Sequence, residues 1–82
     1  MTIENKLKMK KHARFASGLL NILKDDIALI RIDVEQNNMA SLKDSLEETK
    51  DTLQRIMDTV VELDYELYLA EQEISRKKQV HL

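Results

Sequence analysis

The stretch EQNNMAS, Glu35 to Ser41, decides the fold because it separates two long helical patterns. Asn37 and Asn38 within it form helices poorly and tolerate turn and left-handed conformations. Ser41 is expected to cap a second helix, and Asp44, three residues on, suits the positive N-terminal end of such a helix. A connection this short places two helices side by side and antiparallel.

On both sides of this stretch, apolar residues recur in steps of four and three, which keeps them on one helix face as in a coiled coil. The first series is Met9, Ala13, Ala16, Leu20, Leu23, Ile27, Ile30 and Val34. The second series is Leu42, Leu46, Thr49, Leu53, Ile56, Val60, Leu63, Leu67, Ala70 and Ile74. The sequence thus predicts an all-α fold with one domain over residues 1–82: an antiparallel two-helix hairpin with helices over about 3–36 and 41–78 and a turn over about 37–40.

The composition agrees with long helices and excludes several classes of protein. The chain has no proline, one glycine and no cysteine, so neither a disulfide framework nor a thiolate zinc site is expected. Its richest apolar run, GLLNILKDDIALI, is broken by Lys24, Asp25 and Asp26. No run approaches the roughly 20 apolar residues of a membrane span, and the start of the chain lacks the cleavage site of a signal peptide. A soluble protein is therefore expected.

Further apolar residues lie beside the two main series, and we expect them to bind a partner. They are Phe15, Leu19, Ile22 and Leu29 on the first helix, and Met57, Val61 and Tyr68 on the second. A lone two-helix hairpin buries little, so a homodimer that shares these flanks in a four-helix bundle is favoured. A helix of another protein is the alternative occupant. The two flanks project to opposite sides of the rod, or to one side if the first series is centred nearer Leu19.

Asp26 and Asp33 lie seven residues apart in the flanking stripe of the first helix. A carboxylate among apolar residues needs a cation or water, so both are expected at a solvated rim or paired with Lys or Arg. Alternatively they fix the register with a partner, and Asp26 is counted among the partner-binding residues. They stand about 10 Å apart along a helix with no nucleophile nearby, so no catalytic site is expected. His12 and His81 lack further ligands, so neither a metal nor a cofactor is expected.

Positive charge gathers at the two ends of the chain, which a hairpin brings together into a basic end. Its residues are Lys6, Lys8, Lys10, Lys11, Arg14, Arg76, Lys77 and Lys78. This basic end is either simply solvated or meets nucleic-acid phosphate, anionic lipid or an acidic protein surface. Nucleic acid is the weaker partner, because the run lacks interleaved aromatic residues and no helix-turn-helix or zinc finger is evident.

The opening stretch MTIENKLKMKKHARFASGLLNILKDD, together with the length of the chain, resembles the cytoplasmic accessory antiholins of T-even phages, which inhibit lysis. The resemblance spans the whole chain and rests on its overall character, since no short motif defines the family. It implies a cytoplasmic protein that binds the inner segment of a holin beside the anionic inner leaflet and delays hole formation.

The residues themselves predict a small non-enzymatic regulator that binds and sequesters a target protein through an apolar helical flank. Two alternatives stay open. The first is a nucleic-acid-associated protein that uses the basic end, for which affinity would fall steeply with salt. The second is a scaffold or chaperone-type helical rod, which would associate beyond a dimer as its concentration rises.

Overall fold

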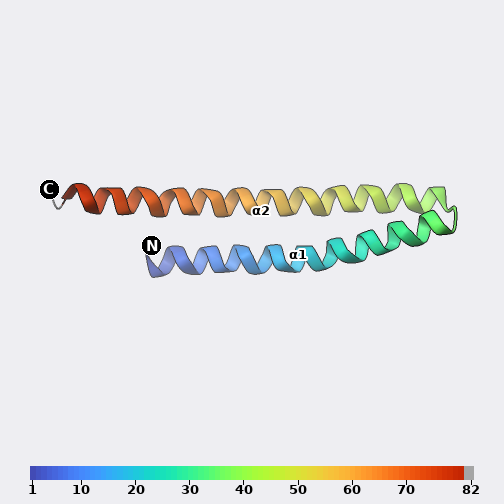
Figure 1. Ribbon diagram of the computed structural model, residues 1–82, viewed down its shortest axis with the longest axis horizontal. Helices are drawn as coiled ribbons and strands as arrows, with labels where there is room; N and C mark the ends of the chain where they lie inside the picture. Colours follow the sequence, from blue (N-terminus) through green and yellow to red (C-terminus); the bar gives the residue numbers. More distant parts are fainter. Residues whose placement is uncertain (81–82) are drawn as a thin grey trace.

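The chain forms two long antiparallel helices, which confirms the predicted all-α hairpin (Figure 1). The computed structural model describes the backbone of residues 1–80 and the side chains of residues 1–76. Helix α1 spans Ile3–Glu35 and helix α2 spans Met39–Val80. The pair makes a rod of 68 × 16 × 13 Å, and α2 extends past the start of α1 (Figure 1).

Helix α1 begins before the basic run, so that run is helical. The hydroxyl oxygen of Thr2 accepts a hydrogen bond from the backbone N–H of Asn5 at 3.1 Å and caps the helix. Glu4 places one acidic side chain in the first turn, where the helix dipole favours it. The lysines therefore start one turn inside the helix.

The turn is closed by backbone hydrogen bonds around Asn37, whose φ of 54° is left-handed. The N–H of Asn38 donates to the carbonyl of Asp33 at 2.9 Å, and the N–H of Asn37 donates to the carbonyl of Val34 at 3.2 Å. This pair of bonds is the Schellman motif, with asparagine in the position that glycine usually takes. Asparagine tolerates this conformation better than other residues with a side chain.

Asn38, and not Ser41, caps the second helix. Its amide oxygen accepts from the backbone N–H of Ser41 at 3.2 Å, and its carbonyl accepts the first helical bond from Leu42. Helix α2 therefore begins at Met39, two residues before the predicted start. The serine hydroxyl is free for another contact, because an asparagine three residues earlier does the capping.

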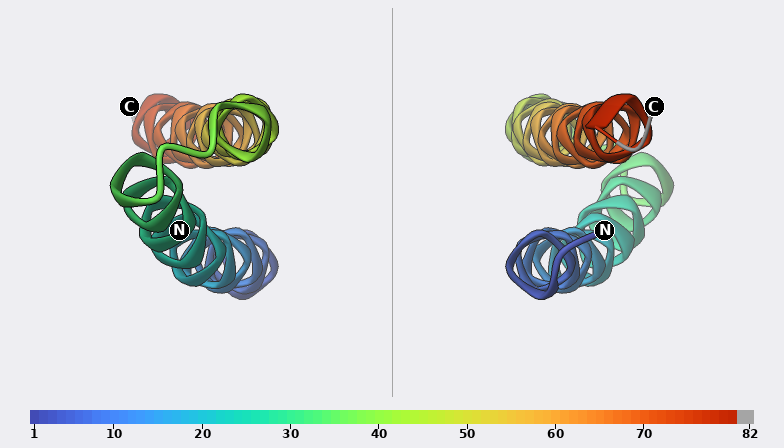
Figure 2. Two further views of the ribbon diagram at one scale, coloured as in Figure 1. Left: turned by 90° about the vertical axis from the view of Figure 1, so that its right-hand side faces the viewer. Right: turned by 90° about the vertical axis from the view of Figure 1, so that its left-hand side faces the viewer.

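The helices meet along a line, here called the seam, that differs from the predicted one. On α1 the buried and half-buried positions of the seam are Asn5, Met9, His12, Ala16, Leu19, Leu23, Asp26, Ile30 and Asp33. On α2 they are Leu42, Ser45, Thr49, Thr52, Ile56, Thr59, Leu63, Glu66, Ala70 and Glu73. Both helices are rotated so that only every second member of each predicted apolar series faces the other helix. End-on, α1 sweeps sideways beneath α2, as in a coiled coil (Figure 2).

The seam is a thin and largely polar core. Among the described residues, Leu19 and Ala70 are the only buried apolar side chains. The buried polar side chains are Asn5, Asp26, Asp33, Ser45, Thr49, Thr52 and Thr59. A hairpin with so little apolar burial is marginal by itself, because chains of this size already struggle to offset the entropy of folding.

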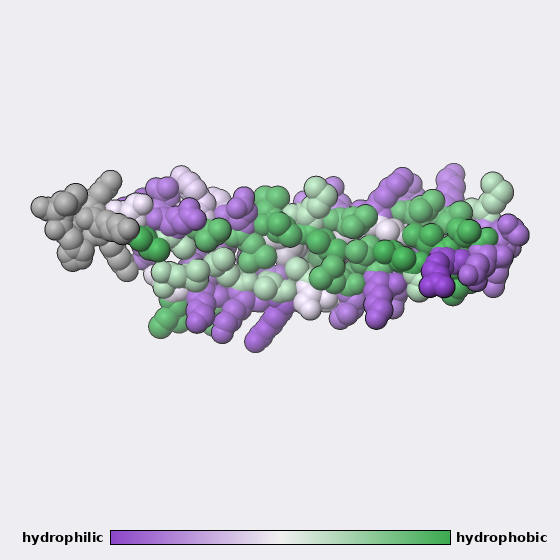
Figure 3. Space-filling view, viewed as in Figure 1, coloured by the Kyte–Doolittle hydropathy of each residue, from purple (hydrophilic) through white to green (hydrophobic). Residues whose placement is uncertain are grey.

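The other members of the predicted series form one exposed surface, here called the apolar band. It consists of Ala13, Leu20, Ile27 and Val34 on α1, and Leu46, Leu53, Val60, Leu67 and Ile74 on α2. Its large side chains keep 42% to 55% of their surface exposed. Two antiparallel helices are related by a two-fold axis perpendicular to the plane that contains them. Residues at equivalent positions relative to the seam therefore lie on the same side of that plane. Hydrophobic side chains accordingly run lengthwise over both helices on one face of the rod (Figure 3).

Candidate protein-binding surfaces

Six of the eight residues that the sequence assigned to partner binding are exposed. Phe15, Ile22 and Leu29 form a stripe along α1, with 47% to 56% of their surface exposed. On α2, Met57 and Val61 are exposed, and so is Tyr68. The apolar band is a separate surface, because its residues follow the seam on the opposite side from the α1 stripe.

Leu19 and Asp26 do not belong to a partner-binding surface, and their assignment was wrong. Leu19 is 4% exposed and Asp26 is 7% exposed, because both occupy seam positions that face α2. The α1 side of the seam is thus centred near Leu19. Periodicity alone could not tell whether the seam on α1 is centred on the predicted series or nearer Leu19, since the residues on both sides of that series are apolar.

Asp26 has a hydroxyl partner in place of the expected cation or water. Thr52 Oγ1 on α2 donates to Asp26 Oδ2 at 2.9 Å, across the buried seam. The same hydroxyl lies 3.1 Å from the carbonyl of Glu48, one turn earlier in its own helix. The carboxylate therefore aligns the two helices of one hairpin and is not available to a second protein.

Asp33 ties the turn to the seam with both of its carboxylate oxygens. Ser41 Oγ donates to Oδ1 and Ser45 Oγ donates to Oδ2, each at 2.8 Å. Its backbone carbonyl also accepts from Asn38 in the turn. Hydrogen bonds to an ionised group are among the stronger ones, so Asp33 fixes the register of the hairpin where the chain reverses.

Other hydroxyls in the seam bond only within their own helix. Thr49 Oγ1 donates to the carbonyl of Ser45 at 2.7 Å, and Thr59 Oγ1 donates to the carbonyl of Arg55 at 2.8 Å. Such bonds satisfy a buried hydroxyl without linking the two helices. At the far end, Asn5 Nδ2 donates to the carbonyl and the carboxylate of Glu66, at 3.1 and 3.0 Å. Hydrogen bonds between the two helices therefore lie at both ends of the seam.

The outer face of α2 carries an aromatic surface, here called the outer patch, which consists of Val61, Tyr65 and Tyr68. These side chains are 55% to 66% exposed and point away from the seam. Two shallow hollows share Val61 and Tyr65; one of them is edged by Asp58 and Glu62. Tyr65 is not among the residues predicted to bind a partner, although its spacing of four from Val61 and three from Tyr68 places it on the same helix face.

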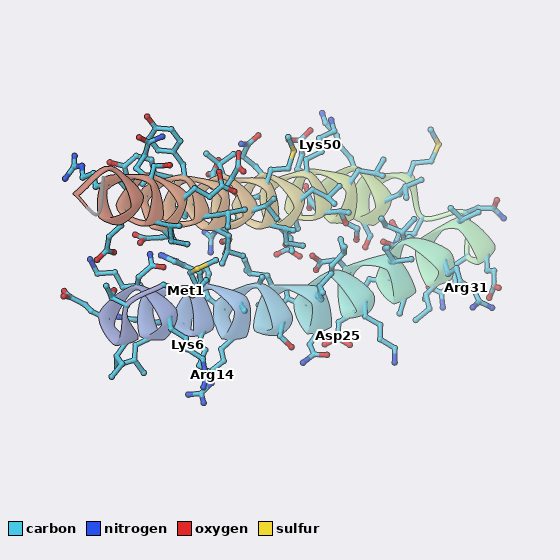
Figure 4. The ribbon with its side chains drawn as sticks, turned by 60° about the vertical axis from the view of Figure 1, so that its left-hand side comes forward. Met1, Lys6, Arg14, Asp25, Arg31 and Lys50 are labelled. Carbon is cyan, nitrogen blue, oxygen red and sulfur yellow. The ribbon has the colours of Figure 1, made fainter. Side chains whose placement is uncertain are left out.

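The basic run of α1 lies beside an acidic segment of α2. That acidic segment contains Glu62, Asp64, Glu66, Glu71 and Glu73, with no Lys or Arg among residues 62–73. His12 Nε2 stands 3.9 Å from Glu62 Oε2, and Lys8 lines one hollow with Glu66. Arg14 points away from α2, as Lys50 points away from α1 (Figure 4). Basic and acidic residues therefore lie side by side at this end of the hairpin, which lowers the net positive charge expected there.

Some of the residues assigned to the basic end lie outside what the structure describes. Arg76 is exposed, while the side chains of Lys77 and Lys78 fall beyond the described side chains, as does His81. Within the described part of the chain, no three His, Asp or Glu side chains stand close enough to hold a metal ion.

Neither of the described helices is long and apolar enough to cross a membrane. Comparison of the chain with protein-family models, with curated proteins and with solved structures finds no match.

Proposed function

We propose that this protein is a non-catalytic regulator that binds and sequesters a target protein through the outer patch of α2. One observation carries the proposal: both tyrosines of the chain stand exposed beside Val61 on a helix face that the hairpin does not use. Tyrosine is enriched in protein interfaces, where its ring supplies buried area and its hydroxyl supplies a hydrogen bond. A face that only had to keep the helix in solution would carry charged residues.

The chemistry of the patch points to a basic amphipathic helix as its target. An extended apolar row on a helix, with members four and three residues apart, fits the apolar face of another helix. Asp58 and Glu62 edge this row, so lysine or arginine beside the apolar face of the target would find opposite charge. Binding would cover the target's own apolar face and so keep it from other partners.

The resemblance to cytoplasmic antiholins gives the proposal its most specific form. In that form the target is the cytoplasmic segment of a holin at the inner face of the membrane, and sequestering it delays lysis. The α1 stripe is the less favoured site, because Phe15 borders a hollow lined by both Arg55 and Glu62, which presents mixed charge. Nucleic acid is disfavoured because the acidic segment of α2 runs beside the basic run.

The test is a binding titration with a fluorescent peptide that spans the holin's cytoplasmic segment. Wild type, Val61→Ala with Tyr68→Ala, and the matched control Phe15→Ala with Ile22→Ala are compared by anisotropy, with helicity checked by circular dichroism. We expect the outer-patch variant to bind about 10- to 100-fold more weakly, as for the loss of interface hot spots, while the control binds like wild type.

Each outcome separates parts of the proposal. Equal binding by wild type and the outer-patch variant would contradict the outer patch as the binding surface. A target peptide that does not bind wild type would contradict the antiholin form. If the immobilised wild type then retained an unrelated protein that the immobilised outer-patch variant did not, the protein would still be a regulator that binds a target through the outer patch.

A further inference from the structure

We infer that the apolar band is covered by a second copy of this chain, packed face to face and turned end for end, so that the two turns lie at opposite ends of a four-helix bundle. This goes beyond the proposed function and does not rest on it. Leu67 of the band and Tyr68 of the outer patch line one hollow, so the two surfaces adjoin. The two tyrosines point away from α1, so a bundle formed through the band leaves them exposed for a target.

The size and place of the band require an occupant that is present whenever the chain is folded. The band spans both helices along most of the rod, and each of its large side chains keeps 42% to 55% of its surface exposed. Soluble monomers rarely expose so large a continuous apolar surface. Within the described chain, the hairpin buries only Leu19 and Ala70 as apolar residues, so its core is incomplete. A second copy is always available, whereas a regulatory target is not.

The charges of α2 beside the band are self-complementary. The row of α2 that borders the band reads Lys43, Lys50, Met57, Asp64 and Glu71, and all five are exposed. Lys43 and Glu71 lie fourteen residues to either side of Met57, and Lys50 and Asp64 lie seven to either side. If two copies of α2 pack antiparallel with Met57 at the centre, each lysine faces an acid of the other copy. Interfaces with two-fold symmetry use such self-complementary surfaces.

The apolar residues of the band also match under the same rotation. Leu53 of one copy then packs over Val60 of the other, and Leu46 packs over Leu67. On α1, Leu20 meets its own copy at the two-fold axis. One axis can pass both the centre of α1 and the centre of α2, because these centres lie side by side in the hairpin. Leu20 falls between His12, which contacts Glu62, and Asp26, which contacts Thr52, so it lies opposite about residue 56 of α2.

Packing with both turns at the same end is the competing arrangement, and it sets like charges together. In that bundle α1 of one copy lies over α2 of the other. Lys24 would then face Lys50, and Arg31 would face Lys43, in both halves of the dimer. The arrangement turned end for end pairs the lysines of α2 with acids of the other α2 and leaves one like-charged contact in each half of the dimer, between Arg31 and Lys10 of the two α1 helices. The balance of attractive over repulsive pairs favours it.

Single-cysteine variants test the arrangement cleanly, because the natural chain has no cysteine. Under mild oxidation Met57→Cys, at the centre of the inferred dimer, should cross-link into a covalent dimer. Val61→Cys on the outer patch and Gln36→Cys at the turn are the matched exposed controls and should not. Efficient cross-linking at Gln36→Cys would overturn the end-for-end arrangement. Cross-linking of all three variants to the same extent would show that the apolar band is not the dimer interface.

Spin labels at Gln36→Cys give a distance that separates the two bundles. The turn lies about 23 Å along the helix from the two-fold axis, so two labels should stand about 45 Å apart. Packing with both turns at one end would bring them within about 20 Å, given the usual spacing of packed helices. The short distance would overturn the inference, as would a monomer at every concentration in sedimentation equilibrium.

Charge reversal at exposed positions tests the pairing without disturbing the hairpin. Lys43→Glu with Lys50→Glu should weaken dimerisation at least tenfold at low salt, and adding Asp64→Lys with Glu71→Lys should restore it. In the competing bundle the first pair of substitutions would remove repulsion and tighten the dimer. Tighter association of that double variant, or no rescue by the quadruple variant, would overturn the inference.

Discussion

The seam and the apolar band are adjacent faces of the same two helices, yet the seam is polar and the band is apolar. Asp26 and Asp33 lie buried in the seam with hydroxyl partners, whereas Leu20 and Leu53 lie half exposed in the band. In most small domains this order is reversed. The difference teaches that the hairpin contact chiefly fixes register, through directional hydrogen bonds, while most of the apolar surface is kept for association.

The largest expected effect comes from the band. Leu53→Ala should lower the free energy of unfolding by about 2 to 4 kcal/mol per chain, because the side chain is buried once a second copy covers it. Chemical denaturation at high protein concentration measures this. A loss below about 0.5 kcal/mol, as for an ordinary surface position, would show that the band stays open and would break the comparison.

A smaller effect distinguishes two threonines at equivalent seam positions. Thr52→Val leaves the buried Asp26 without its donor and should cost about 1 to 3 kcal/mol. Thr59→Val is the matched control, because that hydroxyl bonds only to the carbonyl of Arg55 and its loss should change stability little. Both are measured by denaturant unfolding. Equal costs for the two variants would contradict the role of Asp26 in aligning the helices.

Gly18→Ala should stabilise the hairpin by about 0.5 to 1 kcal/mol, because glycine is a poor helix former. The position is exposed on α1, and beyond the backbone of its own helical turns and its two chain neighbours a methyl group there meets nothing within 4 Å. Denaturant unfolding measures the gain, and the dimer dissociation constant should not change, because the residue is outside the band. A change in that constant would place Gly18 at the interface.

The smallest expected effect on stability lies at the outer patch. Val61→Ala and Tyr68→Ala should each shift the free energy of unfolding by no more than about 0.5 kcal/mol, since both side chains are exposed in the hairpin and in the inferred dimer. Thermal unfolding checks this. A large loss at either residue would mean that the patch is covered by the protein's own packing and is not a surface for a target.

The two helices, the short turn and their antiparallel order followed from the sequence, because long apolar periodicity and paired asparagines are local signals. The rotation of the helices did not. On each helix the apolar stripe covers both a seam row, such as Leu23 or Ile56, and the adjacent band row, such as Leu20 or Leu53. Periodicity finds the centre of such a stripe but not which edge faces the other helix.

The polar seam did leave one signal in the sequence. Asp26 and Asp33 lie seven residues apart on one side of the turn, and Ser45 and Thr52 lie seven apart on the other. Matched spacing of carboxylates and hydroxyls across a short turn indicates cross-helix hydrogen bonds. The exposed members of the predicted flanks, by contrast, followed directly from the helical pattern, because Phe15, Met57 and their neighbours lie outside the seam.

The most direct measurement is the thermal unfolding midpoint of the natural protein, followed by circular dichroism over a hundredfold range of protein concentration. If a second copy completes the core, unfolding is coupled to dissociation, and the midpoint must rise steadily with concentration. A midpoint that stays the same across the whole range would mean that the hairpin is stable alone with its apolar band open to water, and it would contradict the account.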